Sequence, residues 1–184
     1  MEQEAYYGEI QSGHLEQVGY DTYCNLLDEV VKEMKGIDFK KEEEIQIDLD
    51  VTSYIPDEYI SDANQKIEVY QNIALCKNEQ DIEDVIDEIV DRFGDLPKEA
   101  ENLIQIARIK NACREIGVNK ISQKESTIVY WFDSDSFKTE WIDELLQKFR
   151  NQIKFSPAKD PYITYKIKDE RNVLSEVQNF LKIL

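Results

Sequence analysis

Several residue types that carry enzyme chemistry are scarce in this sequence of 184 residues. Its one histidine, His14, stands in a glycine-flanked turn, and its three cysteines, Cys24, Cys76 and Cys113, are too scattered for a zinc cluster or a disulfide framework. A nucleophilic triad needs a base held by a third group. The six glycines form no GxxxxGK[ST] phosphate-binding loop, and no DxD-type cluster stands out. We therefore expect no catalytic residue, no metal site and no cofactor in this chain.

Long apolar runs are also missing. No stretch approaches the ~18 consecutive apolar residues that a membrane-spanning helix needs. The N-terminal MEQEAYYGEI lacks the basic flank and the apolar block of a secretory signal. A composition of 41% hydrophobic and 33% charged residues is typical of soluble globular proteins. The sequence thus predicts a cytoplasmic protein.

Negative charge is in excess but unevenly distributed. The net charge is −17, and residues 118–184 contain 11 Lys and Arg against 10 Asp and Glu, whereas residues 1–117 contain 11 against 29. Basic patches drive binding to phosphate backbones. We therefore expect negligible DNA affinity, which tight binding at physiological salt would contradict. The acidic part suggests a basic protein partner or simply supports solubility.

Apolar spacing predicts mainly helices over the first two thirds of the chain. Helical patterns cover residues 15–34, about 63–76, 81–93, and a segment opened by Pro97 and ended by Gly117. The third helix has Asn78 as its N-cap and ends at Gly94, with Phe93 as an anchor. We expect the helix near 63–76 to bury Ile67, Tyr70, Ile73 and Ala74, and to be capped by Asp62 and Asn64.

Strands are expected before and after these helices. IQIDLDV (45–51) alternates apolar and polar residues, as does YITYKIK (162–168), and TIVYWF (127–132) is typical of a central strand. Helical spacing recurs over 137–149 and 173–184, and Trp131 and Trp141 are interpreted as core residues because each lies in an apolar period. These elements predict an α+β fold, in which several amphipathic helices pack with a small, mainly antiparallel sheet.

Three ordered passages carry information that composition does not. They are GEIQSGHLEQVGYDTYCNLL (8–27), YIPDEYISDANQKIEVY (54–70) and DEIVDRFGDLPKEAENLIQIARIKNACREIGV (87–118). In order and spacing they resemble the C-terminal end of the bacterial transcription-repair coupling factor (Mfd) family. The resemblance spans essentially the whole chain and is strongest over 8–118.

The resemblance implies a parent protein much larger than this chain. The family's proteins are ATP-dependent double-stranded DNA translocases that displace stalled RNA polymerase and recruit UvrA, with ATP and Mg bound by a motor that precedes this region. Residues 1–35 resemble the helical tail of that motor, and Gly8, Gln11 and Gly13 match the end of its translocation motif. Ile10 departs from the family's usual glutamate. Residues 36–44 are then a linker, and residues 45–184 the C-terminal regulatory domain.

In the resting parent, the resemblance implies that this domain clamps a UvrB-like N-terminal module and hides its UvrA-binding surface. Four acids on the helix 81–93, namely Asp84, Asp87, Glu88 and Asp91, follow three- and four-residue steps opposite the apolar stripe. The resemblance selects Glu88 and Asp91 as partners of arginines in that module. Arg92 either pairs locally or reaches the same module. Lys66 stands where the family commonly has an arginine, and Asn72 where it has a basic residue. Neither side chain reproduces the fork of arginine, so the resemblance gives weaker support for a bidentate contact from that helix.

Other interpretations stay open at this point. The acidic row could be an ordinary solvated helix face. The chain could be a free-standing acidic adaptor, or a nucleic-acid mimic, that binds a basic protein. A small carboxylate-dependent hydrolase would instead show a cleft of acids with strongly perturbed pKa values.

Overall fold

A computed structural model describes residues 45–156 and 159–184. These residues form two compact units: residues 52–107 make up unit one, and residues 45–51 together with 108–184 make up unit two. Helix α5 (Lys98–Ile116) runs along the chain from unit one into unit two. The predictions on residues 1–35 and 36–44, including the motif residues Gly8, Gln11 and Gly13, lie outside the described residues.

Unit one contains helices α3 (Ala63–Leu75) and α4 (Glu79–Phe93) and the first part of α5. Two of the predicted caps are confirmed, because the Asp62 and Asn78 side chains accept hydrogen bonds from backbone N–H groups in the first turns of α3 and α4. Gly94 ends α4 with φ +86°, as predicted from the freedom of glycine in this region. The Tyr59 hydroxyl donates to the Gly94 carbonyl at 2.6 Å and ties this turn to the segment before α3.

The inward face of α3 differs in part from the prediction. Tyr70 and Ile73 are buried as expected, but Ala74 is exposed and Ile67 only half-buried. Val69 and Lys66 complete the buried face. A lysine can occupy a buried position because its apolar stem packs inside while its ammonium group reaches a polar partner. Here that partner is the Asp57 carboxylate, with which Lys66 forms an ion pair.

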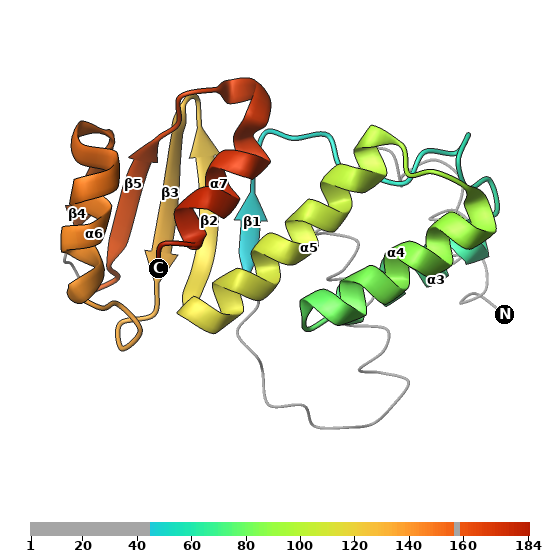
Figure 1. The fold of residues 1–184 in the computed structure, drawn as a ribbon, viewed down its shortest axis with the longest axis horizontal. Coiled ribbons are helices and arrows are strands. Elements are labelled where there is room, and N and C mark those ends of the chain that lie inside the picture. The colour runs from blue at the N-terminus through green and yellow to red at the C-terminus, as the bar shows by residue number, and fades with distance from the viewer. Residues whose placement is uncertain (1–44, 157–158) are drawn as a thin grey trace, which may run out of the picture. The chain divides into compact units, whose positions relative to one another are not determined.

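Unit two is built on a five-stranded sheet (Figure 1). The strands β1 (Gln46–Asp48), β2 (Val118–Lys124), β3 (Thr127–Phe132), β4 (Ile153–Ser156) and β5 (Tyr162–Lys166) lie in the order β1-β2-β3-β5-β4. The β1–β2 pair is parallel and the other pairs are antiparallel. The α+β fold with a mainly antiparallel sheet and a central strand at 127–132 is thus confirmed, whereas β2 was not predicted.

Helices α6 (Glu140–Phe149) and α7 (Val173–Leu181) cover one face of this sheet, and short 3-10 turns η1 (Arg150–Gln152) and η2 (Glu170–Asn172) precede β4 and α7 (Figure 1). Phe180 of α7 stacks on Tyr130 with ring centres 4.3 Å apart, and the ring centre of Phe149 of α6 lies 4.8 Å from that of Tyr165. Trp141 is buried in this core, as predicted. No helix in the described part of the chain is long and apolar enough to cross a membrane.

The prediction that Trp131 is a core residue is wrong. Tyr130 and Phe132, its neighbours in β3, are both buried against the helices, so alternation turns Trp131 to the opposite face of the sheet. There it is half-buried, with the Lys120 ammonium 5.2 Å from its ring centre. The apolar run around Trp131 predicts a strand. It does not indicate which face of the sheet the helices cover.

Candidate interdomain interface on helix α4

Helix α4 presents one apolar face and one acidic face. Ile82 and Ile89 are buried in the core of unit one, and Val85, Ile86, Val90 and Phe93 are half-buried around them. The four predicted interface acids, Asp84, Asp87, Glu88 and Asp91, are all exposed. Their spacing places them on the side opposite the buried isoleucines. The acids are therefore available at the surface of unit one, as the clamp hypothesis requires.

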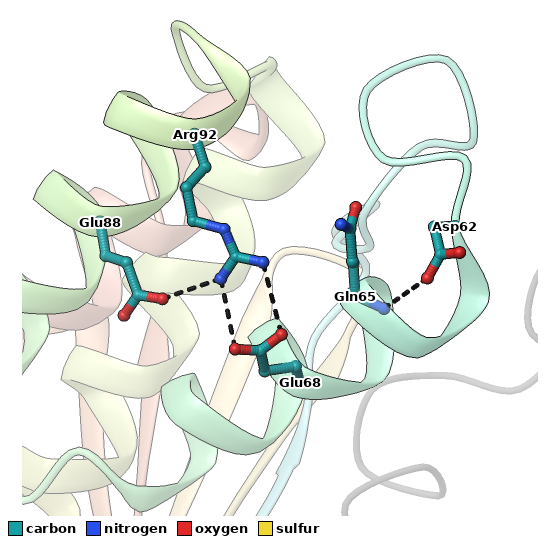
Figure 2. A network of polar contacts seen from close by, with 5 residues as sticks. All are labelled: Asp62, Gln65, Glu68, Glu88 and Arg92. Atoms are coloured by element: carbon teal, nitrogen blue, oxygen red, sulfur yellow. Dashed lines mark hydrogen bonds and ion pairs between the residues drawn. The ribbon is translucent and has the colours of Figure 1, made fainter.

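Arg92 is engaged within unit one by two carboxylates (Figure 2). Its Nη1 lies 2.9 Å from Oε1 of Glu88, one turn earlier on α4. Its Nη1 and Nη2 also donate to the two carboxylate oxygens of Glu68 on α3, at 3.3 and 3.4 Å. Hydrogen bonds to Glu68 and then to Glu88 raise the pKa of Arg92 above its ordinary value. The structure thus favours local pairing of Arg92, one of the two roles that the sequence left open.

The network adds one residue that sequence reasoning did not select. Glu68 lies on the exposed side of α3, and Arg92 brings its carboxylate beside that of Glu88 (Figure 2). Glu68 and Arg92 are 24 residues apart, and only the antiparallel packing of α3 against α4 makes them neighbours. No spacing rule within a single helix could have found this contact.

The four acids of α4 differ in whether they form hydrogen bonds or ion pairs within unit one. Glu88 is bound to Arg92, and Asp84 accepts a 2.8 Å hydrogen bond from the Gln80 side chain. Asp87 and Asp91 make no hydrogen bond or ion pair to any residue in the described ranges. These two carboxylates can therefore bind an external cation without breaking an internal contact.

The arrangement suits binding better than catalysis. The acids follow the outer surface of one helix, so they do not converge on a shared point as a carboxylate-dependent hydrolase requires. Within residues 45–156 and 159–184, no group of three or more His, Cys, Asp or Glu residues is placed to hold a metal ion. The chemistry that the face can perform is the charge-assisted hydrogen bonding of arginine or lysine groups.

Comparisons with known proteins agree with the motifs. The TRCF domain family matches residues 49–140. The transcription-repair-coupling factor of Rickettsia prowazekii is 32% identical over 176 residues, which cover 95% of this chain and 16% of that protein. Its counterpart in Escherichia coli is 31% identical over 147 residues, covering 77% and 13%, and that of Bacillus subtilis is 36% identical over 122 residues, covering 66% and 10%.

A solved structure shows the same fold. The crystal structure of the C-terminal domain of transcription-repair coupling factor superposes with a TM-score of 0.69 at 22% identity, over 78% of this chain and 93% of that chain. The present chain spans 16% or less of the length of the relatives named above. The chain belongs to the transcription-repair-coupling factor family, and it carries that family's TRCF domain.

Proposed function

We propose that this chain is the C-terminal autoinhibitory and interaction domain of a DNA translocase that couples transcription to nucleotide-excision repair. In this proposal the acidic face of α4 holds arginines of a UvrB-like module in the same protein, and so covers the surface through which that module recruits UvrA. Displacement of stalled RNA polymerase, with ATP and Mg, is assigned to the motor of the parent protein. The observation that supports the clamp is the row of exposed acids on a capped helix, in which Asp87 and Asp91 have no partner in the described part of unit one.

The energetics favour a cationic partner. Like charges one turn apart on a helix repel by a few tenths of a kcal/mol per pair. A partner arginine relieves this repulsion, and each charge-assisted hydrogen bond contributes on the order of 1.5–3 kcal/mol where water is excluded. Arg92 provides an internal example, because its fork already joins Glu68 and Glu88 (Figure 2).

The test is a binding titration of the chain against the separately produced UvrB-like module. The double variant Glu88→Arg with Asp91→Arg should stay folded, since both side chains are exposed, and should lose binding. A control variant, Glu115→Arg with Glu144→Arg, changes two exposed acids elsewhere by the same total charge and should bind like wild type. Raising the salt concentration should weaken the wild-type complex. If the Glu88/Asp91 variant held the module as tightly as wild type, the clamp would be wrong.

In the parent protein, the same double variant should raise the affinity for UvrA and the basal motor activity. Both changes follow if the contact hides a surface in the resting state. A variant that loses the module contact in the titration, but leaves UvrA affinity unchanged in the parent, would separate binding from autoinhibition. That result would contradict the regulatory part of the proposal.

A further inference from the structure

The sheet of unit two has a second face, which its helical core does not use. The strand register places Lys120, Trp131, Tyr162 and Ser156 in one row across β2, β3, β5 and β4. The next row contains Asp48, Ser122, Val129, Thr164 and Lys154, and a third contains Lys124, Thr127 and Lys166. These residues alternate with the buried ones, so they point away from α6 and α7. We call this surface the open sheet face.

The open sheet face is basic, although the chain as a whole is acidic. The three rows contain four lysines, Lys120, Lys124, Lys154 and Lys166, and one acid, Asp48. Three of the lysines are exposed and Lys120 is half-buried. Within the described ranges, none of the four forms an ion pair with a carboxylate. Their positive charge is therefore not neutralised by an ion pair to any carboxylate in the described part of unit two.

Two aromatic rings lie side by side on this face. Trp131 and Tyr162 are direct cross-strand partners, half-buried, with ring centres 6.2 Å apart. The Lys120 ammonium lies 5.2 Å from the Trp131 ring centre, so a cation is held next to the ring surface. Adjacent aromatic rings on a sheet face, with lysines around them, can stack bases and contact phosphates together.

We infer that the open sheet face binds single-stranded nucleic acid, with bases against Trp131 and Tyr162 and phosphates near the four lysines. A single strand fits because its bases are free to lie on exposed rings, whereas those of a duplex are paired and stacked inside. An acidic protein could form ion pairs with the lysines, but it would make no specific use of the neighbouring rings of Trp131 and Tyr162. The inference concerns unit two and does not rest on the clamp of α4.

The sequence predicts negligible affinity for DNA. For single strands, this inference replaces that expectation with weak binding. That expectation came from the net charge of −17, which averages over the whole surface. At physiological salt the charges of exposed groups are screened over about 8 Å, so the local charge of a face decides what it binds. Four lysine contacts are few, and the isolated chain should bind weakly. The logarithm of the affinity should fall with the logarithm of salt with a slope of about 3.

The experiment measures the fluorescence anisotropy of a labelled oligothymidine on titration with the full chain, first at low salt and then over a salt series. The variant Lys120→Glu with Lys154→Glu and Lys166→Glu should weaken binding by at least about tenfold. The control, Lys77→Glu with Lys98→Glu and Lys182→Glu, makes the same change in net charge at three exposed lysines that do not belong to the rows of the open sheet face. It should bind within about twofold of wild type, since its lysines do not contact the strand. Equal weakening by both triple variants would overturn the inference.

A second pair of variants tests stacking separately from charge. Trp131→Leu should weaken oligothymidine binding by about tenfold, whereas Trp131→Phe keeps an aromatic surface and should retain most of it. Near-ultraviolet circular dichroism and thermal unfolding should show both variants folded. The absence of any anisotropy change for wild type at low salt would overturn the inference. Binding of polyglutamate in place of the oligonucleotide would also overturn it, and would assign the face to an acidic protein.

Discussion

The guanidinium of Arg92 lies 2.9 Å from the carboxylate of Glu88, four residues earlier on α4. The same guanidinium bridges to Glu68 on α3, so an arginine next to the candidate interface is used inside unit one (Figure 2). All three side chains are partly exposed, at 31% for Arg92, 46% for Glu88 and 50% for Glu68. A surface network of this kind contributes little to stability. It does occupy the carboxylates of Glu68 and Glu88, which a binding partner would otherwise meet unpaired.

Replacing Arg92 distinguishes a local from an interfacial role. Arg92→Met should change the free energy of unfolding only slightly, because the ion pairs of Arg92 are exposed to solvent. It frees Glu68 and Glu88, and should tighten binding of an arginine-bearing partner by roughly threefold to tenfold. Arg92→Lys, which keeps the charge but not the fork, should lie between Met and wild type. Weaker binding by Arg92→Met in a calorimetric titration would show that Arg92 itself contacts the partner.

The half-buried ion pair of Lys66 and Asp57 gives a prediction on stability. The Lys66 side chain is 7% exposed and that of Asp57 is 66% exposed, so the pair connects the interior of unit one to its surface. Asp57→Asn leaves the ammonium without its charge partner and should cost about 1–3 kcal/mol of unfolding free energy in a urea titration. Lys66→Met fills the same space without a charge and should be neutral or stabilising.

A matched control for this pair is the exposed contact between Lys98 and Glu101, whose Lys98 side chain is 76% exposed. Lys98→Met should change the unfolding free energy by no more than about 0.5 kcal/mol. A loss of stability in Lys66→Met as large as that in Asp57→Asn would mean that the charge at position 66 is itself required.

The helices could be predicted from the sequence where periodicity and caps agree. Asn78 and Gly94 bound α4 as expected, because a capping side chain and a residue with positive φ act within one turn. Strand β2 was missed, since VNKISQK (118–124) has only Val118 and Ile121 as apolar residues. Its strand character comes from pairing with β1 and β3, which is information outside its own window.

The candidate site was predictable only in part. The acids of α4 are visible from spacing along one helix, but Glu68 joins them through a contact between two helices. Trp131 was misplaced because the sequence does not say which face of the sheet the helices cover. The sequence prediction also treated residues 45–184 as one domain and drew no boundary within them. The continuous helical pattern of α5 runs through the point at which the two units divide.

The glycines Gly94 and Gly117 should respond differently to alanine. Both have positive φ, +86° and +82°, so alanine is strained at either position. A Cβ at Gly94 would meet nothing within 4 Å, whereas a Cβ at Gly117 would lie 2.2 Å from Cβ of Ser136. Gly94→Ala should therefore lower the free energy of unfolding by about 1–3 kcal/mol, because only the backbone conformation is strained. Gly117→Ala should cost more in the same denaturant titration.

The steric part of the Gly117 effect can be isolated. Adding Ser136→Gly removes the clashing side chain, and should recover part of the stability that Gly117→Ala loses, but not the backbone part. Comparable losses in Gly94→Ala and Gly117→Ala, with no recovery in the double variant, would contradict the close approach at Ser136.

Alkaline pH should destabilise the core of unit two through Cys113. Burial raises the pKa of its thiol from 9.0 to about 12. The unfolded thiol releases its proton near pH 9 while the folded one keeps it, so the unfolded state binds fewer protons and the unfolding free energy falls as pH rises. The stabilisation is fully present below pH 9 and is lost between pH 9 and about 12. Burial also raises the pKa of the Tyr130 hydroxyl well above 10.0, which adds to the loss at higher pH.

Urea titrations at a series of pH values from 8 to 11 test this prediction against a matched variant. Cys113→Ala removes the ionisable group, and its unfolding free energy should fall less steeply with pH than that of wild type. Val177→Ala removes a fully buried side chain that cannot ionise, so it should lower stability by a similar amount at every pH and keep the wild-type slope. The comparison separates lost packing from lost proton linkage. Parallel curves for wild type and Cys113→Ala would show that the thiol does not control the alkaline limit of the fold.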